Sequence, residues 1–112
     1  MIEVRDAAGI QRNDRQVVAL VGRYAVISTG RHMVIVEHAD GSTSSTNQVV
    51  RVVLDDMAWV DLRVRPEPEM TALTGKRVVA TGRLIARSTR EGPGAHPDPS
   101  PTLVDIESVV EQ

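Results

Sequence analysis

The stretch Gln16–Ser28 reads Gln-Val-Val-Ala-Leu-Val-Gly-Arg-Tyr-Ala-Val-Ile-Ser, and it decides the fold class. Only Gln16, Arg23 and Ser28 are plainly polar, so both faces of an extended strand built from it would be largely apolar. Its β-branched residues pack well on a pleated sheet. Because a glycine inside such a run often marks a bend, we expect Gly22 to be the point where one strand serves two sides of a closed sheet.

The same β pattern continues along the chain on both sides of a single helical signal. Further strands are predicted at His32–Glu37, Val49–Leu54, Ala58–Arg65, Lys76–Ile85 and Thr102–Val110. Pro66–Thr74 is the only segment that reads as a helix, because it begins with proline and acidic residues and is followed by Gly75. The alternating apolar positions predict one core, which Leu73 caps and Tyr24 borders: Val18, Leu20, Val50, Val52, Val60, Leu62, Val78, Ala80 and Ile106.

Two segments carry the composition of loops. His38–Gln48 has no large apolar residue and is rich in residues that favour turns. Arg87–Pro101 contains several prolines and glycines, which regular elements do not tolerate. We therefore expect these two segments to be exposed and mobile loops.

The length and composition are typical of one globular domain. The chain has 112 residues, of which 41% are hydrophobic and 25% charged, and it has no cysteine. We expect residues 1–15 to form an amino-terminal segment before a β domain that spans residues 16–110. The net charge of -2 argues against attraction to nucleic acid or to an anionic membrane. The lack of a long apolar run and of a secretory signal predicts no membrane association and a cytoplasmic location.

The order of the expected elements resembles that of the OB-fold superfamily. The segment Ala72–Leu84 (Ala-Leu-Thr-Gly-Lys-Arg-Val-Val-Ala-Thr-Gly-Arg-Leu) is similar to the passage from helix to fourth strand in small bacterial OB domains. The resemblance implies an all-β fold, a small Greek-key barrel of five to six strands with one short helix between strands three and four. It also implies that a ligand would meet the face of strands two and three.

On this face, Trp59 lies on the polar side of its strand, between arginines. An aromatic platform flanked by Arg51 and Arg63, with Arg83 nearby, is what stacking of bases or sugars needs. The competing interpretation is that another part of the chain covers Trp59, since tryptophan is usually well buried. Binding of single-stranded nucleic acid or an oligosaccharide through these residues is therefore the alternative hypothesis.

No catalytic, cofactor or metal site is predicted. Thr74-Gly75-Lys76 resembles the end of a phosphate-binding loop, but the earlier glycine of that motif is absent. His32 and His38 would lie roughly 20 Å apart on a continuous strand, which is too far for a shared metal ion. His96 in the second loop is expected to be an exposed loop residue. An enzyme is therefore not expected, and neither is a cofactor.

The leading hypothesis for function is a non-enzymatic module that binds a partner protein or itself. Val17, Val21 and Ile27 fall on the second apolar face of the first long strand. A small barrel should not leave so many aliphatic side chains in water. We therefore expect these three residues to bind a partner protein or a second copy of the chain.

Overall fold

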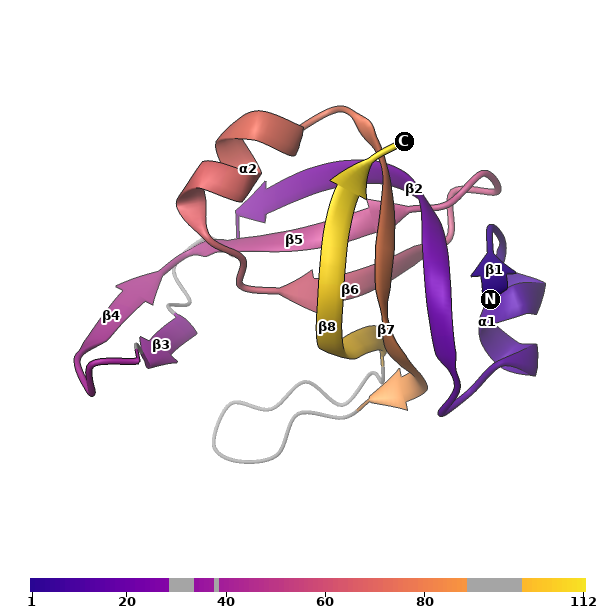
Figure 1. Cartoon of the computed structure of the whole chain (residues 1–112), viewed down its shortest axis with the longest axis horizontal. Helices are drawn as coiled ribbons and strands as arrows, with labels where there is room; N and C mark the ends of the chain where they lie inside the picture. Colours follow the sequence, from indigo (N-terminus) through magenta and orange to yellow (C-terminus); the bar gives the residue numbers. More distant parts are fainter. Residues whose placement is uncertain (29–33, 38, 89–99) are drawn as a thin grey trace.

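The protein is mostly β, as the apolar alternation of its sequence predicts. The computed structural model describes residues 1–28, 34–37, 39–88 and 100–112. The elements in chain order are β1 (Ile2–Val4), α1 (Ala7–Arg12), β2 (Val17–Ser28), β3 (Val34–Glu37), β4 (Thr43–Thr46), β5 (Gln48–Val53), β6 (Trp59–Arg63), α2 (Glu67–Leu73), β7 (Arg77–Ser88) and β8 (Ser100–Glu111). Figure 1 shows the long strands crossing one another around a common interior.

The main sheet has six strands and closes partly into a ring. Its order is β1-β2-β5-β6-β8-β7, and β2 pairs in addition with β7. Most neighbours are antiparallel, whereas β6 and β8 are parallel and meet at the single pair Asp61–Thr102. The ring is therefore continuous everywhere except between β6 and β8, where the pairing is minimal.

The bend expected at Gly22 is confirmed. Val17–Arg23 of β2 pairs with β7, and Arg23–Ser28 pairs with β5. A Cβ atom at Gly22 would lie 2.4 Å from the carbonyl oxygen of Val53, a distance that real side chains do not adopt. Glycine is required here because the backbone of β5 passes directly against β2.

The predicted core is confirmed in most of its members. All of the expected strand residues are buried in one cluster except Ile106, which is partly buried and packs against it, as does Leu73. Tyr24 is fully buried, so the expectation that it borders the core was wrong. The cluster also contains Val4 and Ile10, which lie in the segment expected to precede the β domain.

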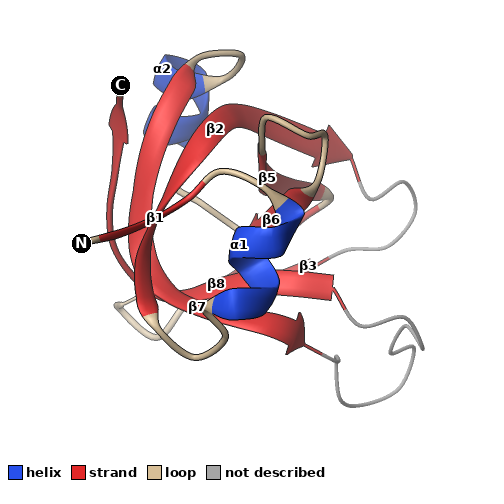
Figure 2. Cartoon of the chain, turned by 90° about the vertical axis from the view of Figure 1, so that its right-hand side faces the viewer, coloured by secondary structure: helices blue, strands red, loops and turns tan. Residues whose placement is uncertain are grey.

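That amino-terminal segment forms a strand and a second helix, which corrects the expectation of a single helix. β1 runs parallel to β2, and α1 connects the two (Figure 2). Asp6 caps α1, because its Oδ1 accepts a hydrogen bond of 2.7 Å from the amide of Gly9. The helix has only six residues, and it places Ile10 into the core.

The expected loops are partly strands. Thr43–Thr46, inside the first expected loop, forms β4 and pairs with β3 in a separate two-stranded sheet. Thr43–Thr46 itself has no large apolar side chain, which is why the composition of this segment did not reveal a strand. The second expected loop begins within β7 and ends within β8, while residues 89–99 lie outside the described residues, as does His38. The expectation of a helix at Pro66–Thr74 is confirmed by α2.

Candidate functional site

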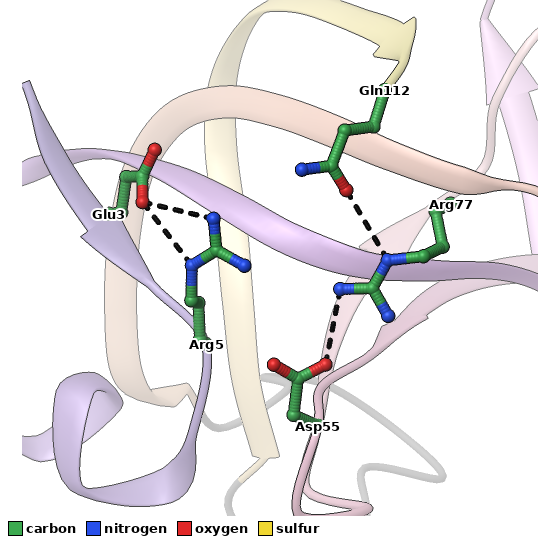
Figure 3. Close-up of polar contacts among 5 residues, drawn as sticks. All are labelled: Glu3, Arg5, Asp55, Arg77 and Gln112. Carbon is green, nitrogen blue, oxygen red and sulfur yellow. Dashed lines mark hydrogen bonds and ion pairs between the residues drawn. The ribbon is translucent and has the colours of Figure 1, made fainter.

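The residues expected to bind a partner on β2 differ widely in exposure. Val17 is 43% exposed, Ile27 is half-buried, and Val21 is only 1% exposed. The expectation that Val21 lies on the surface was wrong, because both faces of β2 are covered close to its bend. Figure 3 shows two polar contacts of its neighbours: Glu3, opposite Ala19 of β2, contacts Arg5, and Arg77, opposite Arg23 of β2, contacts Asp55.

Val17 instead lies beside the start of β1, where two further apolar side chains are exposed. The parallel register pairs Ile2 with Val18, so Ile2 is at the margin of the core-facing side, whereas Met1 is beside Val17 on the outer side of the same strand ends. Met1 is 82% exposed and Ile2 is 42% exposed. Of the five exposed large hydrophobic side chains among the described residues, three therefore lie at this end of the β1–β2 pair. We call Met1, Ile2 and Val17 the N-terminal patch.

Charges of both signs lie within three residues of the N-terminal patch along the chain. Nη2 of Arg5 lies 3.2 Å from Oε2 of Glu3, and Nε of Arg15 lies 4.0 Å from Oδ2 of Asp14. Arg83 on β7 is directly opposite Val17 in the sheet. An apolar centre with an exposed, mixed-charge rim is the anatomy of many protein interfaces.

A polar groove of about 390 Å³ lies next to this patch, between β1 and α1. It is lined by Glu3, Arg5, Asp6, Gly9, Arg12 and Asn13. Its side chains are already engaged within the chain: Arg5 pairs with Glu3, Asp6 caps α1, and the side-chain amide of Asn13 donates to the carbonyl of Gly9 at 2.8 Å. Arg12, which also lines the groove, donates to the carbonyl of Ala8 at 3.4 Å. The groove therefore offers a polar border to the patch.

The structure brings together two of the four residues expected on the alternative ligand face. Cζ of Arg51 on β5 lies 3.9 Å from the centre of the Trp59 ring on β6. Nε of Arg51 also donates a hydrogen bond of 3.0 Å to Oδ1 of Asp61, the residue opposite it in the sheet. Because the guanidinium covers one face of the ring and is neutralised by a carboxylate, little of this platform remains for an incoming base.

The other two expected residues do not complete this face. Arg63 is exposed at the end of β6 and adopts a φ of 61°, so its backbone leaves the regular strand geometry. Arg83 lies on β7, whose sheet neighbours are β2 and β8. The four arginine and tryptophan side chains therefore do not form one continuous basic and aromatic surface.

A network that the sequence analysis did not predict fixes α2 on the sheet. Glu69 accepts two hydrogen bonds from Arg65, at 2.8 and 2.9 Å, and one from the hydroxyl of Tyr24 at 2.9 Å. Burial by itself raises the pKa of Glu69, but the hydrogen bonds from Arg65 and Tyr24 outweigh it and lower that pKa below its usual value. Burial and the bond to Glu69 raise the pKa of Tyr24. The i, i+4 spacing of Arg65 and Glu69 was the available sequence signal.

The remaining site expectations concern metal ions and membranes. His32, His38 and His96 all lie outside the described residues. In the part of the chain that the structure describes, no three His, Asp or Glu side chains are grouped as metal ligands would be. Neither α1 nor α2 is long and apolar enough to cross a membrane.

Comparisons of the chain with the profiles of known families, with curated proteins and with solved structures found no match.

Proposed function

We propose that this chain is a non-enzymatic interaction and assembly module, which binds a second copy of itself through the N-terminal patch. The observation that carries the proposal is that exposed Met1, Ile2 and Val17 lie together at the end of the sheet where β1 and β2 begin. Surface aliphatic residues scattered singly need no explanation, whereas a cluster with a polar rim is typical of a contact surface.

A symmetric contact between two copies is favoured by the charges around the patch. Each copy supplies both signs, with Glu3 and Asp14 beside Arg5 and Arg15. In a two-fold contact the same surface meets itself, so a rim that carries both signs can be complementary to its own copy. A rim of one sign would repel a second copy and favour a different partner.

We infer further that the partly closed ring is a barrel of the OB type. The ring order β2-β5-β6-β8-β7 supports this inference, as do the parallel pair β6–β8 and the position of α2 between β6 and β7. β1 and α1 would then be additions to the five-stranded plan. A barrel of this type is a scaffold for binding surfaces of several kinds, so the fold by itself does not select a function.

The absence of cysteine from the chain gives a direct test of the proposed contact. A single cysteine introduced by Val17→Cys can form a disulfide only between chains, and proximity in a two-fold dimer would accelerate it. We expect rapid cross-linking of Val17→Cys and of Ile2→Cys under mild oxidation. Val110→Cys is the matched control, because Val110 is similarly exposed, at 53%, but lies on β8.

The second test of the dimer is the molar mass of the protein in solution. Light scattering with size-exclusion chromatography should show a dimer whose dissociation constant rises by at least about tenfold in Val17→Asp. Circular dichroism should show that this variant remains folded, because Val17 is outside the core cluster. A monomer at every concentration, with no preference for cross-linking at Val17 or Ile2 over Val110, would disprove the proposed dimer.

Binding of single-stranded nucleic acid or an oligosaccharide through β5 and β6 is the second candidate function. The placement of Trp59 and Arg51 on the neighbouring strands β6 and β5 favours it, because a ring and a cation can bind a base or a sugar if Arg51 moves off the ring. The ion pair with Asp61 and the net charge of -2 weigh against it. Fluorescence of Trp59, the only tryptophan, separates the two candidates.

A further inference from the structure

One edge of β8 has no strand beside it for most of its length. β8 pairs with β7 from Ser100 to Glu111 along one edge, but with β6 only at Thr102. From Val104 to Glu111 no strand of the described chain pairs with the second edge. In Figure 1 this part of β8 runs in front of β5 and β6, with β7 beside it on one side. Free backbone N–H and C=O groups on such an edge are a template for a further strand.

A bulge confines the usable part of this edge to the end of β8. The register with β7 shifts between Thr81 and Arg83, and Asp105 adopts a φ of 48°. Here β8 packs closely on Gly82, where a Cβ atom would lie 2.8 Å from the carbonyl oxygen of Val104. Bulges of this kind interrupt pairing. The regular edge open to a new strand is therefore Ser108–Glu111.

The side chains of this edge present an apolar row to a neighbouring strand. Val110 is opposite Val79 on β7, and Val79 is opposite Val21 on β2. The row ends at Val110, which is 53% exposed. On the other face of β8, Val109 is partly buried against the core. A strand added at this edge could continue the apolar row with one side chain beside Val110.

The charges of the edge are acidic. The described chain from Ser100 to Gln112 contains Asp105, Glu107 and Glu111 and no basic residue. Two of them form exposed ion pairs, Asp105 with Arg83 of β7 at 4.0 Å and Glu111 with Lys76, just before β7, at 3.6 Å. An added strand would bring its own side chains closer to these carboxylates, and basic residues would be favoured there.

The same charges disfavour pairing of β8 with β8 of a second copy. An antiparallel pair centred on Val109 would place Glu107 of each copy opposite Glu111 of the other. Like charges directly opposite each other destabilise a sheet. The occupant that fits this edge is therefore a different chain with the opposite charge.

We propose that the edge Ser108–Glu111 of β8 binds an extended, basic segment of a partner protein as an additional strand. The segment has an apolar residue that faces Val110 and lysine or arginine residues that face Glu107 and Glu111. This inference rests on the proposed function in one respect, that the chain is a protein-binding module. It uses a surface separate from the N-terminal patch, so a dimer and a bound segment can coexist.

The test uses two synthetic peptides of alternating sequence, acetyl-Lys-Val-Thr-Val-Lys-Val-Thr-amide, whose lysines have the spacing of Glu107 and Glu111, and the same peptide with glutamate in place of lysine. We expect the lysine peptide alone to bind, and to slow amide hydrogen exchange at Ser108–Glu111, because strand addition protects backbone N–H groups. The double variant Glu107→Lys/Glu111→Lys should weaken binding at least about tenfold. Gln11→Lys/Thr71→Lys is the control with the same number of added lysines at exposed helix positions.

Equal binding of both peptides, or equal affinity of the two double variants, would overturn the proposal. Binding without slower exchange at Ser108–Glu111 would also overturn it, because charge attraction alone leaves the amides exposed. The outcome is independent of the dimer test. A monomeric protein that binds the lysine peptide in this way disproves the N-terminal contact only, and a dimer that ignores the peptide disproves the edge site only.

Discussion

The hydroxyl of Tyr24 lies 2.9 Å from Oε2 of Glu69, a residue 45 positions further along the chain, and joins the centre of β2 to α2. Tyr24 is fully buried, and its backbone N–H and C=O also bond to Lys76 and Gly75, which follow α2. One residue of the first long strand therefore fixes the helix and the turn that leads into β7.

We expect Glu69→Gln to destabilise the protein more than Tyr24→Phe does. Tyr24→Phe removes one hydrogen bond to a charged group, at a cost of about 1.5–3 kcal/mol. Glu69→Gln weakens that bond and also leaves the partly buried guanidinium of Arg65 without its counter-charge. Urea unfolding measures both changes, with Glu67→Gln as the control on the exposed side of α2. Equal stability of all three variants and the parent would mean that the network does not hold α2.

The carboxylate of Glu69 should also make the stability of the protein depend on pH. The pKa of Glu69 is lowered in the folded protein, so its contribution is complete above the ordinary glutamate pKa of about 4.3 and is lost as the pH falls through the lowered value. The difference in free energy of unfolding between the parent and Glu69→Gln should therefore shrink from about pH 7 to about pH 3. A difference that stays constant over this range would contradict the lowered pKa.

Gly22→Ala should be among the most destabilising single substitutions in the chain. Its Cβ atom would lie 2.4 Å from the carbonyl oxygen of Val53, so one of two paired strands has to move. We expect a loss of about 3 kcal/mol or more. Gly75→Ala is the control, because its φ of 81° costs about 1–2 kcal/mol while no atom lies within 4 Å of the added carbon. Similar losses of stability in both variants would show that the contact of the added Cβ atom with Val53 does not determine the effect of Gly22→Ala.

The sequence predicted what depends on local pattern and missed what depends on distant partners. Alternation placed the long strands and nearly all of the core, and the glycine in a long apolar run located the bend of β2. The burial of Tyr24 was missed because its hydroxyl is satisfied by Glu69 from another element. The burial of Val21 was missed because strict alternation assigns one face to solvent, whereas close to the bend both faces are covered.

Short helices and strands were also missed in the prediction from sequence. α1 has six residues and buries only Gly9 and Ile10, too few for a helical period to be visible in the sequence. The capping aspartate before it was its local signal. For the candidate sites, the sequence located Val17 and the Arg51–Trp59 pair. It could not show that Met1 and Ile2 join Val17, because that depends on the parallel register of β1 with β2.

The contribution of α1 to the core can be measured directly. Ile10→Ala removes a side chain that is 2% exposed and should cost about 2–5 kcal/mol. The neighbouring exposed position supplies the control Gln11→Ala, which should be nearly neutral. Thermal unfolding followed by circular dichroism compares the two. A single transition at lower temperature in Ile10→Ala would place α1 in the same cooperative unit as the sheet, whereas an unchanged midpoint would mean that α1 contributes nothing to its stability.

The Arg51–Trp59 contact predicts that single-stranded nucleic acid leaves the fluorescence of this protein unchanged at physiological salt. The guanidinium lies 3.9 Å from the ring centre and is held there by Asp61, so a base that stacks on this side must first displace Arg51. The net charge of -2 offers little compensating attraction for phosphates.

Because Trp59 is the only tryptophan, its emission during titration with an oligothymidine reports on this face alone. Asp61→Asn is the informative variant, since it releases Arg51 without removing it and should increase any residual binding. Quenching of the parent protein that falls steeply with added salt would favour the nucleic-acid function over the assembly module.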